Sequence, residues 1–278
     1  MAVTSHVKVQ RGVATFGASA ATIAVTITAV SSLANAFARV TAVHHGCADP
    51  AAGTTSNKNN IDGGARALLT GLSTVTIDVP SGRTAEDRTV YWEVWEYTGP
   101  AGGPYEFVVR QHSTNSIGAG ATSNTNATNL SATAGNLVPI ACGATNDVSS
   151  QTYGSSLARI DIVGSSPNLN VRTVRGGNGG TCVVAFAAVE FTGSLWQVQK
   201  VSHTFAASGA DETETISDVT SWAQTLILCC GHSIAGTAAT NADVGVIAFQ
   251  GADTTHVRFR INTGHANPTA TLVNVAVL

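Results

Sequence analysis

Apolar and polar residues alternate with a period of two wherever the chain has a regular pattern. Clear examples are residues 22–28 (TIAVTIT), 72–79 (LSTVTIDV) and 257–261 (VRFRI). This alternation buries one face of a strand and leaves the other in water, as in antiparallel sheets. No segment carries the 3.6-residue apolar stripe of an amphipathic helix. The sequence therefore predicts an all-β fold.

Internal repetition organises these strands. The sequence reads Val-Gln-Arg from Val9, Val-Arg-Gln from Val109 and Val-Gln-Lys from Val198, which gives offsets of 100 and 89 residues. A fixed spacing over long stretches indicates repeated structural units. At these offsets apolar positions align in triplets: Val30 with Leu130 and Val219, and Phe37 with Leu137 and Leu226. Chance similarity between Ala/Thr-rich strands remains the alternative.

Each copy has roughly the size of one β-sandwich of six to eight short strands. We therefore predict three tandem antiparallel sandwiches of jelly-roll or immunoglobulin-like type, at residues 1–99, 105–193 and 194–278. The Pro/Gly-rich stretch between the first two copies is typical of a linker. Almost no linker separates the second and third copies, so we expect these two to be closely docked.

Composition excludes several classes of protein. Only 11% of residues are charged and the net charge is −3, so the chain lacks the basic surface that binds nucleic-acid phosphates. Thr, Ser and Gly interrupt every apolar run, so no transmembrane helix or membrane insertion is expected. The first eight residues lack the basic segment and apolar core of a secretory signal.

The five cysteines do not indicate a disulfide framework, and four of them are expected to be small buried hydrophobes. Their number is odd and no secretory signal accompanies them. Four of them, Cys142, Cys182, Cys229 and Cys230, lie in apolar strand contexts. A Cys142–Cys182 disulfide within the second copy remains open.

Two short motifs contain metal-ligating residue types. They are residues 44–47 (HHGC) and 229–232 (CCGH). Adjacent strand residues point to opposite faces, so neither motif favours the tetrahedral convergence that zinc requires. A third stretch, residues 231–236 (GHSIAG), is one residue longer than the nucleophile motif of hydrolases. We predict no metal and no cofactor.

Acidic residues give no clear catalytic pair. Glu93 and Glu96 are three residues apart on one strand, so they project to opposite faces. The acidic residues at 86–87 and 211–214 are expected in solvated turns or strand ends. Two carboxyls flanking a glycosidic bond remain an open alternative. The prediction is that the protein has no catalytic residues and is not an enzyme.

Aromatic residues gather in residues 91–97 (YWEVWEY). One face of this strand must be core, and the other would then present aromatic rings beside acids, as at a sugar-stacking or protein-contact surface. Trp92, Trp95 and Tyr97 are therefore candidate ligand or partner contacts. Core packing combined with contact between modules is the alternative interpretation.

The segment 7–12 (VKVQRG), the following Ala/Thr-rich strand as far as residues 37–40 (FARV), and residues 189–193 (VEFTG) resemble small β-sandwich modules in structural proteins of tailed bacteriophages. Such modules occur in head-decoration, collar and tail-appendage proteins. The resemblance covers most of the chain and identifies a class of particle rather than a position on it. It carries over no catalytic residue.

The resemblance implies a non-enzymatic structural protein that decorates the capsid or tail of a virion through its β-sandwich faces. The implied partners are capsid or tail subunits, with the protein itself a homo-oligomer on the particle. The implied location is the virion, after synthesis in the bacterial cytoplasm. The alternative is a carbohydrate-binding receptor-recognition module of a tail or head fibre, whose ligand would be a host surface glycan.

Overall fold

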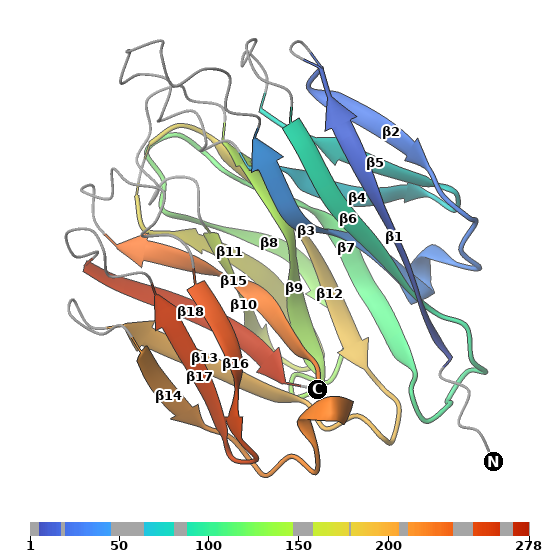
Figure 1. Ribbon diagram of the computed structural model, residues 1–278, viewed down its shortest axis with the longest axis vertical. Coiled ribbons are helices and arrows are strands. Elements are labelled where there is room, and N and C mark those ends of the chain that lie inside the picture. The colour runs from blue at the N-terminus through green and yellow to red at the C-terminus, as the bar shows by residue number, and fades with distance from the viewer. Residues whose placement is uncertain are drawn as a thin grey trace.

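The computed structural model describes residues 6–17, 20–45, 64–80, 88–146, 158–177, 179–205, 211–235, 247–261 and 269–277. The all-β prediction is confirmed, because these residues form strands β1 to β18, and every strand pairing is antiparallel. Figure 1 shows the chain running from β1 at one side of the molecule to β18 at the other.

The strands fall into three successive sets of six, termed modules. Module 1 consists of β1 (Val7–Phe16), β2 (Thr22–Thr26), β3 (Ala36–His45), β4 (Arg66–Gly71), β5 (Thr74–Asp78) and β6 (Arg88–Tyr97). Module 2 consists of β7 (Phe107–Ile117), β8 (Ser123–Leu130), β9 (Leu137–Asn146), β10 (Ala158–Ser165), β11 (Asn168–Arg175) and β12 (Cys182–Phe191). Module 3 consists of β13 (Gln199–Phe205), β14 (Asp211–Thr215), β15 (Ile227–Ala235), β16 (Ile247–Asp253), β17 (His256–Ile261) and β18 (Thr269–Val277).

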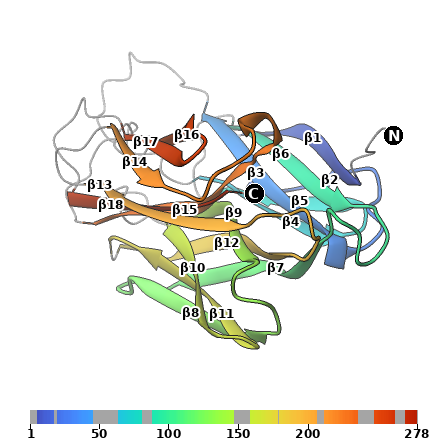
Figure 2. The ribbon, with the colours of Figure 1, turned by 90° about the horizontal axis from the view of Figure 1, so that it is seen from below.

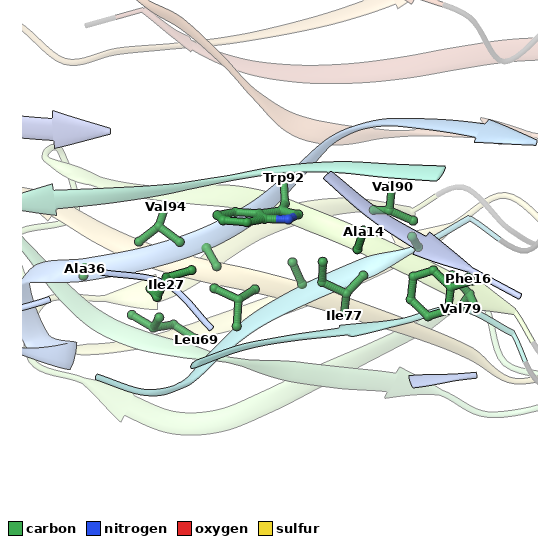
Figure 3. Packing of buried hydrophobic residues seen from close by; sticks show 14 of the residues in the cluster. Ala14, Phe16, Ile27, Ala36, Leu69, Ile77, Val79, Val90, Trp92 and Val94 are labelled. Carbon is green, nitrogen blue, oxygen red and sulfur yellow. The ribbon is translucent and has the colours of Figure 1, made fainter. Parts of the chain in front are cut away.

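One strand order recurs in all three modules. The first, sixth and third strands are neighbours in each set, as β1-β6-β3, β7-β12-β9 and β13-β18-β15. The second, fifth and fourth strands form the other sheet, as β2-β5-β4, β8-β11-β10 and β14-β17-β16. In module 1 the two sheets enclose an apolar core in which Phe16 and Val90 meet Ile77 and Val79 (Figure 3). Buried apolar clusters also lie among the strands of module 2 and of module 3, so all three modules have a β-sandwich-like arrangement.

The sheets continue from one module into the next. Strand β4 pairs with β9 at Arg66 and Gly143, and β10 pairs with β15 at Arg159 and Gly231. Two six-stranded sheets result, β2-β5-β4-β9-β12-β7 and β13-β18-β15-β10-β11-β8. The modules are therefore joined through backbone pairing as well as through side chains. We call these contacts the first and second junctions.

Seen from below, the three modules surround a common centre (Figure 2). A buried apolar cluster, termed the junction core, occupies this region and draws residues from every module. Its buried members are Phe37 and Tyr97 of module 1, Phe107, Val109, Val138, Ile140, Cys142, Ala185, Ala187, Val189 and Phe191 of module 2, and Leu228 and Cys230 of module 3. The three sandwiches consequently share one core in addition to their own interiors.

A β-bulge explains why the repeated Val-Gln-Arg motif appears permuted in module 2. The register of β7 against β12 shifts between Val109 and Gln111, which leaves Arg110 as the extra residue. Gln111, rather than Arg110, therefore corresponds to Gln10 and Gln199. The ungapped alignment was wrong by one residue at this point.

The glutamines bind the end of the second strand of each module or the segment just after it. The Gln10 side chain donates to the Thr28 carbonyl (2.9 Å) and accepts from the Thr28 amide (3.0 Å). Gln199 makes the same pair of bonds to Ser217. In module 2, Gln111 accepts a hydrogen bond from the hydroxyl of Thr128. The repeated motif therefore has a structural role.

The predicted triplets of apolar positions are only partly equivalent. Val30, Leu130 and Val219 are all buried, which fits the alignment. Leu137, however, pairs with Glu190, whereas the matching Glu96 pairs with Ala36 rather than with Phe37. A one-residue slip moves a side chain to the other face of a sheet. Phe37 accordingly lies in the junction core, while Leu137 lies inside module 2.

Candidate functional site

The structure places the three candidate aromatic residues in packed surroundings. Trp92 is 6% exposed inside module 1, and Tyr97 is 1% exposed in the junction core, where its hydroxyl donates to the Pro100 carbonyl. Trp95 is half-buried and stacks on Phe37, with ring centroids 6.2 Å apart. Of the three residues, only Trp95 keeps surface that a ligand could reach.

The expectation that β6 presents an exposed aromatic face is therefore corrected. The sheet β1-β6-β3 lies between the interior of module 1 on one side and the junction core on the other. Of the β6 residues Tyr91 alone is exposed, at 43%, and the stretch from Trp92 to Tyr97 is largely covered on both faces. Trp92 and Tyr97 are core residues, as the alternative interpretation predicted.

Glu93 is a buried carboxylate fixed by three donors. Its Oε1 accepts from Arg39 Nε and from Trp95 Nε1, each at 2.7 Å, and Arg11 Nε lies 3.2 Å from Oε2. The Arg39 guanidinium also lies over the Trp95 ring, 5.9 Å from its centroid. Glu93 holds β1, β3 and β6 together, and its lone pairs are committed to these donors.

Glu96 and Glu190 perform one structural task in two modules. Glu96 accepts from the Ser31 amide and Glu190 from the Thr133 amide, each at 2.6 Å. Both carboxylates therefore hold the turn that precedes the third strand. This explains why the sequence repeats Glu-Tyr-Thr-Gly as Glu-Phe-Thr-Gly. Glu93 and Glu96 project to opposite faces, as expected, and do not form a catalytic pair.

The described cysteines are all free. Cys142 and Cys230 lie in the junction core, and Cys182 lies inside module 2. The Cys142–Cys182 disulfide is therefore not formed. Burial raises the pKa values of Cys142 and Cys230 well above the usual range, so their thiols stay protonated. The prediction of buried small hydrophobes is confirmed for these three residues, and Cys229 is half-buried.

The remaining motifs provide no assembled metal or nucleophile site in the described part of the chain. His44 and His45 end β3, while Gly46, Cys47 and Gly236 lie outside the described residues, as do the acids at positions 86 and 87. Among the described side chains, no group of three or more His, Cys, Asp or Glu could hold a metal ion.

Arginine side chains close both junctions in the same way. Arg66 Nη1 donates to Thr145 Oγ1 (2.8 Å), and Arg159 Nη1 donates to Ser233 Oγ (2.9 Å). Each hydroxyl lies two residues after the glycine that pairs with the arginine. Ser233, which the hydrolase-like motif had singled out, is 5% exposed and is used in this contact.

Sequence reasoning missed these arginines, although a signal was present. The spacing Gly-x-Thr at Gly143 recurs as Gly-x-Ser at Gly231, 88 residues later. The offset of 89 used for the repeat conceals this match. The extra residue Arg110 in β7 accounts for the difference, because Gln111, the residue after it, already matches Gln199 at an offset of 88.

We expect the Arg66–Thr145 contact to contribute directly to stability. A double-mutant cycle with Arg66→Met and Thr145→Val should give a coupling free energy of about 1 kcal/mol, since one donor is charged and the pair is partly buried. Chemical denaturation measures it. Additive effects of the two substitutions would show that the contact contributes nothing.

Among the described residues, no strand pairing joins module 3 to module 1. If β16 approached β3 with the register of the first and second junctions, Ala248 would take the place of the arginine. Ala42 would take the place of the glycine, and His44 that of the hydroxyl residue. In the described chain, β16 and β3 each have a hydrogen-bonded neighbour on one edge only. On β1 and β6 of module 1, Val13 and Tyr91 are 53% and 43% exposed, and the Arg11 side chain is 69% exposed.

His112 of β7 lies at the first junction. Burial lowers its pKa to about 4, and the carbonyl groups of Ala38 and Ala67 oppose this shift only in part. The unfolded chain has a histidine pKa of about 6.5, so it binds more protons than the folded protein below that pH. Stability conferred by neutral His112 is therefore complete above pH 6.5 and is lost as the pH falls toward 4.

This shift predicts an acid-sensitive junction. Between pH 7 and pH 5 the free energy of unfolding should fall by about 1–2 kcal/mol through His112 alone. The His112→Gln variant should lose that part of the pH dependence, measured by denaturant titration at both pH values. Identical pH dependence in the two proteins would contradict the assignment.

Comparison with known proteins gives no relative. No protein-family model matches the chain, and no curated protein matches it. In the described residues, no helix is long and apolar enough to cross a membrane.

Proposed function

We propose that this protein is a non-enzymatic structural component of a bacteriophage particle, which binds capsid or tail subunits through its β-sandwich faces. One observation carries the proposal: the buried carboxylates and arginines, which are the residue types that could serve in catalysis, instead bind neighbouring strands, turns and modules together. Glu93 joins three strands, Glu190 fixes a turn, and Arg66 and Arg159 close the junctions.

The exposed strand surfaces support the same function. Strand β8 (Ser123–Leu130, SNTNATNL) lies at the edge of a six-stranded sheet, and nearly all of its residues are exposed. Its short hydroxyl and amide side chains carry no charge. Covering such a surface with a neighbouring subunit avoids the large desolvation cost of burying ions. An uncharged surface of this kind therefore suits a protein that packs against neighbouring subunits.

The carbohydrate-binding alternative loses most of its original support. It rested on an exposed aromatic platform, and Trp92 and Tyr97 are buried. Stacking on a sugar requires an accessible ring face.

Quantitative mass spectrometry of purified particles tests the proposal. Particles released by the bacterium that carries the gene would be separated on a density gradient. The protein should keep a constant molar ratio to the major capsid protein across the particle fractions, while an abundant cytoplasmic host protein should not. A protein confined to the particle-free fractions would overturn the proposal.

A further inference from the structure

A cavity of about 410 Å³ opens at the second junction, between β10 of module 2 and β13 of module 3. Its lining includes the β10 residues 159–163, Arg172 of β11 and residues 200–202 of β13. Pro139 of β9 and Cys230 of β15 complete it. This volume falls within the range of about 300–1,000 Å³ that is usual for small-molecule sites.

Positive charge predominates in the lining. Asp161 receives Arg172 Nη2 at 2.8 Å and Arg159 Nε at 3.3 Å, so a single carboxylate serves two guanidinium groups. Lys200 donates to the carbonyl of Ala134, and no ion pair between described residues includes it. Three cations and one carboxylate give the cavity a formal charge of +2, although the whole chain carries −3.

The Lys200 side chain is exposed overall, and partial loss of water around its ammonium lowers its pKa. The ammonium therefore remains accessible to an anion that enters the cavity, with which it could form a charge-assisted hydrogen bond.

The charged lining is particular to the second junction. By strand register, Leu68 occupies the position of Asp161, and His112 occupies that of Lys200. Leu68 packs against the junction core. The second junction replaces this apolar contact with charges around an open space. Departures from local packing rules of this kind are typical of functional sites.

We propose that this cavity binds an anionic monosaccharide, a sugar bearing one carboxylate or phosphate group. The anionic group would lie between Lys200 and Arg172, since ammonium and guanidinium groups bind carboxylate and phosphate through charge-assisted hydrogen bonds. Asp161 distinguishes a sugar acid from a bare anion. Its carboxylate, which also receives both arginines, can accept a further hydrogen bond from a sugar hydroxyl, and free phosphate lacks such hydroxyls. Pro139 and Val163 provide apolar wall for the C–H face of a sugar.

Calorimetric titration of the full chain at low salt tests this proposal, with glucuronate, glucose 6-phosphate, neutral glucose and inorganic phosphate as probes. Both acidic sugars should bind at least about tenfold more tightly than glucose or inorganic phosphate. Lys200→Gln should weaken their binding about tenfold, as loss of one charge-assisted bond implies. Lys200→Arg should retain it.

The matched control is Lys8→Gln, which removes an exposed lysine on β1 and should leave binding unchanged. Arg172→Gln provides a second variant at a partly exposed position, and thermal unfolding verifies that each variant is folded. Equal binding of glucose and glucuronate, or unchanged binding in folded Lys200→Gln, would overturn the proposal. Inorganic phosphate binding as tightly as the acidic sugars would overturn the sugar assignment. The inference does not depend on the structural role in a particle.

Discussion

Replacing Gly143 with alanine should lower the free energy of unfolding by about 3 kcal/mol or more. A Cβ atom at this position would lie 2.1 Å from the Ala65 carbonyl oxygen, which belongs to the backbone entering β4. The residue also has a φ of 107°, which L-residues adopt only with strain. The steric clash and the backbone strain both destabilise the folded protein, and both occur at the residue that pairs β9 with β4.

Gly118→Ala is the matched control for this substitution. A Cβ there meets nothing within 4 Å, and the residue does not have a positive φ, so its effect should stay within about 0.5 kcal/mol. Gly231→Ala, at the second junction, should behave like Gly143→Ala because its Cβ would lie 2.3 Å from the Ala158 carbonyl oxygen. Urea titrations compare the three variants. A Gly143→Ala protein as stable as the control would show that β4 and β9 do not meet as described.

Truncation of Phe37 to alanine should cost about 3–5 kcal/mol. The side chain is 1% exposed, lies in the junction core, stacks on Trp95 and meets Phe107 edge-on at 5.9 Å. Its removal leaves a cavity between modules 1 and 2 that backbone pairing prevents from collapsing. Because Trp95 loses its stacking partner, the native-state tryptophan fluorescence should change as well.

Leu33→Ala is the control, since Leu33 lies nearby in the sequence and is 44% exposed. Its effect should remain below about 0.5 kcal/mol. Leu137→Ala should cost about 2–5 kcal/mol without the fluorescence change, because Leu137 lies inside module 2. If Phe37→Ala proved as mild as Leu33→Ala, the junction core would not exist as described.

Periodicity predicted the strands that have one free face. Strand β2 alternates between exposed and half-buried residues, in agreement with the pattern at residues 22–28. It could not predict that strands such as β12 are covered on both faces, where nearly every residue is buried. Burial of a second face depends on how modules pack, and single-strand patterns contain no such information. The prediction of an exposed aromatic face on β6 was wrong for this reason.

β-Bulges limited how accurately the three copies could be aligned from the sequence. The extra residue Arg110 shifts every later position of β7 by one, and a one-residue shift exchanges the faces of a strand. Offsets without gaps therefore aligned Phe37 with Leu137, which face different cores. The charged cavity around Lys200 was missed for another reason: its residues come from five strands of two modules, and no local spacing brings them together.

Differential scanning calorimetry of the full chain tests most directly whether the three modules form one cooperative unit. The continuous sheets and the shared junction core predict a single transition, with equal calorimetric and van't Hoff enthalpies. Two or three separable transitions, or a calorimetric enthalpy several times the van't Hoff value, would contradict it, because modules that unfold independently cannot share their sheets and core.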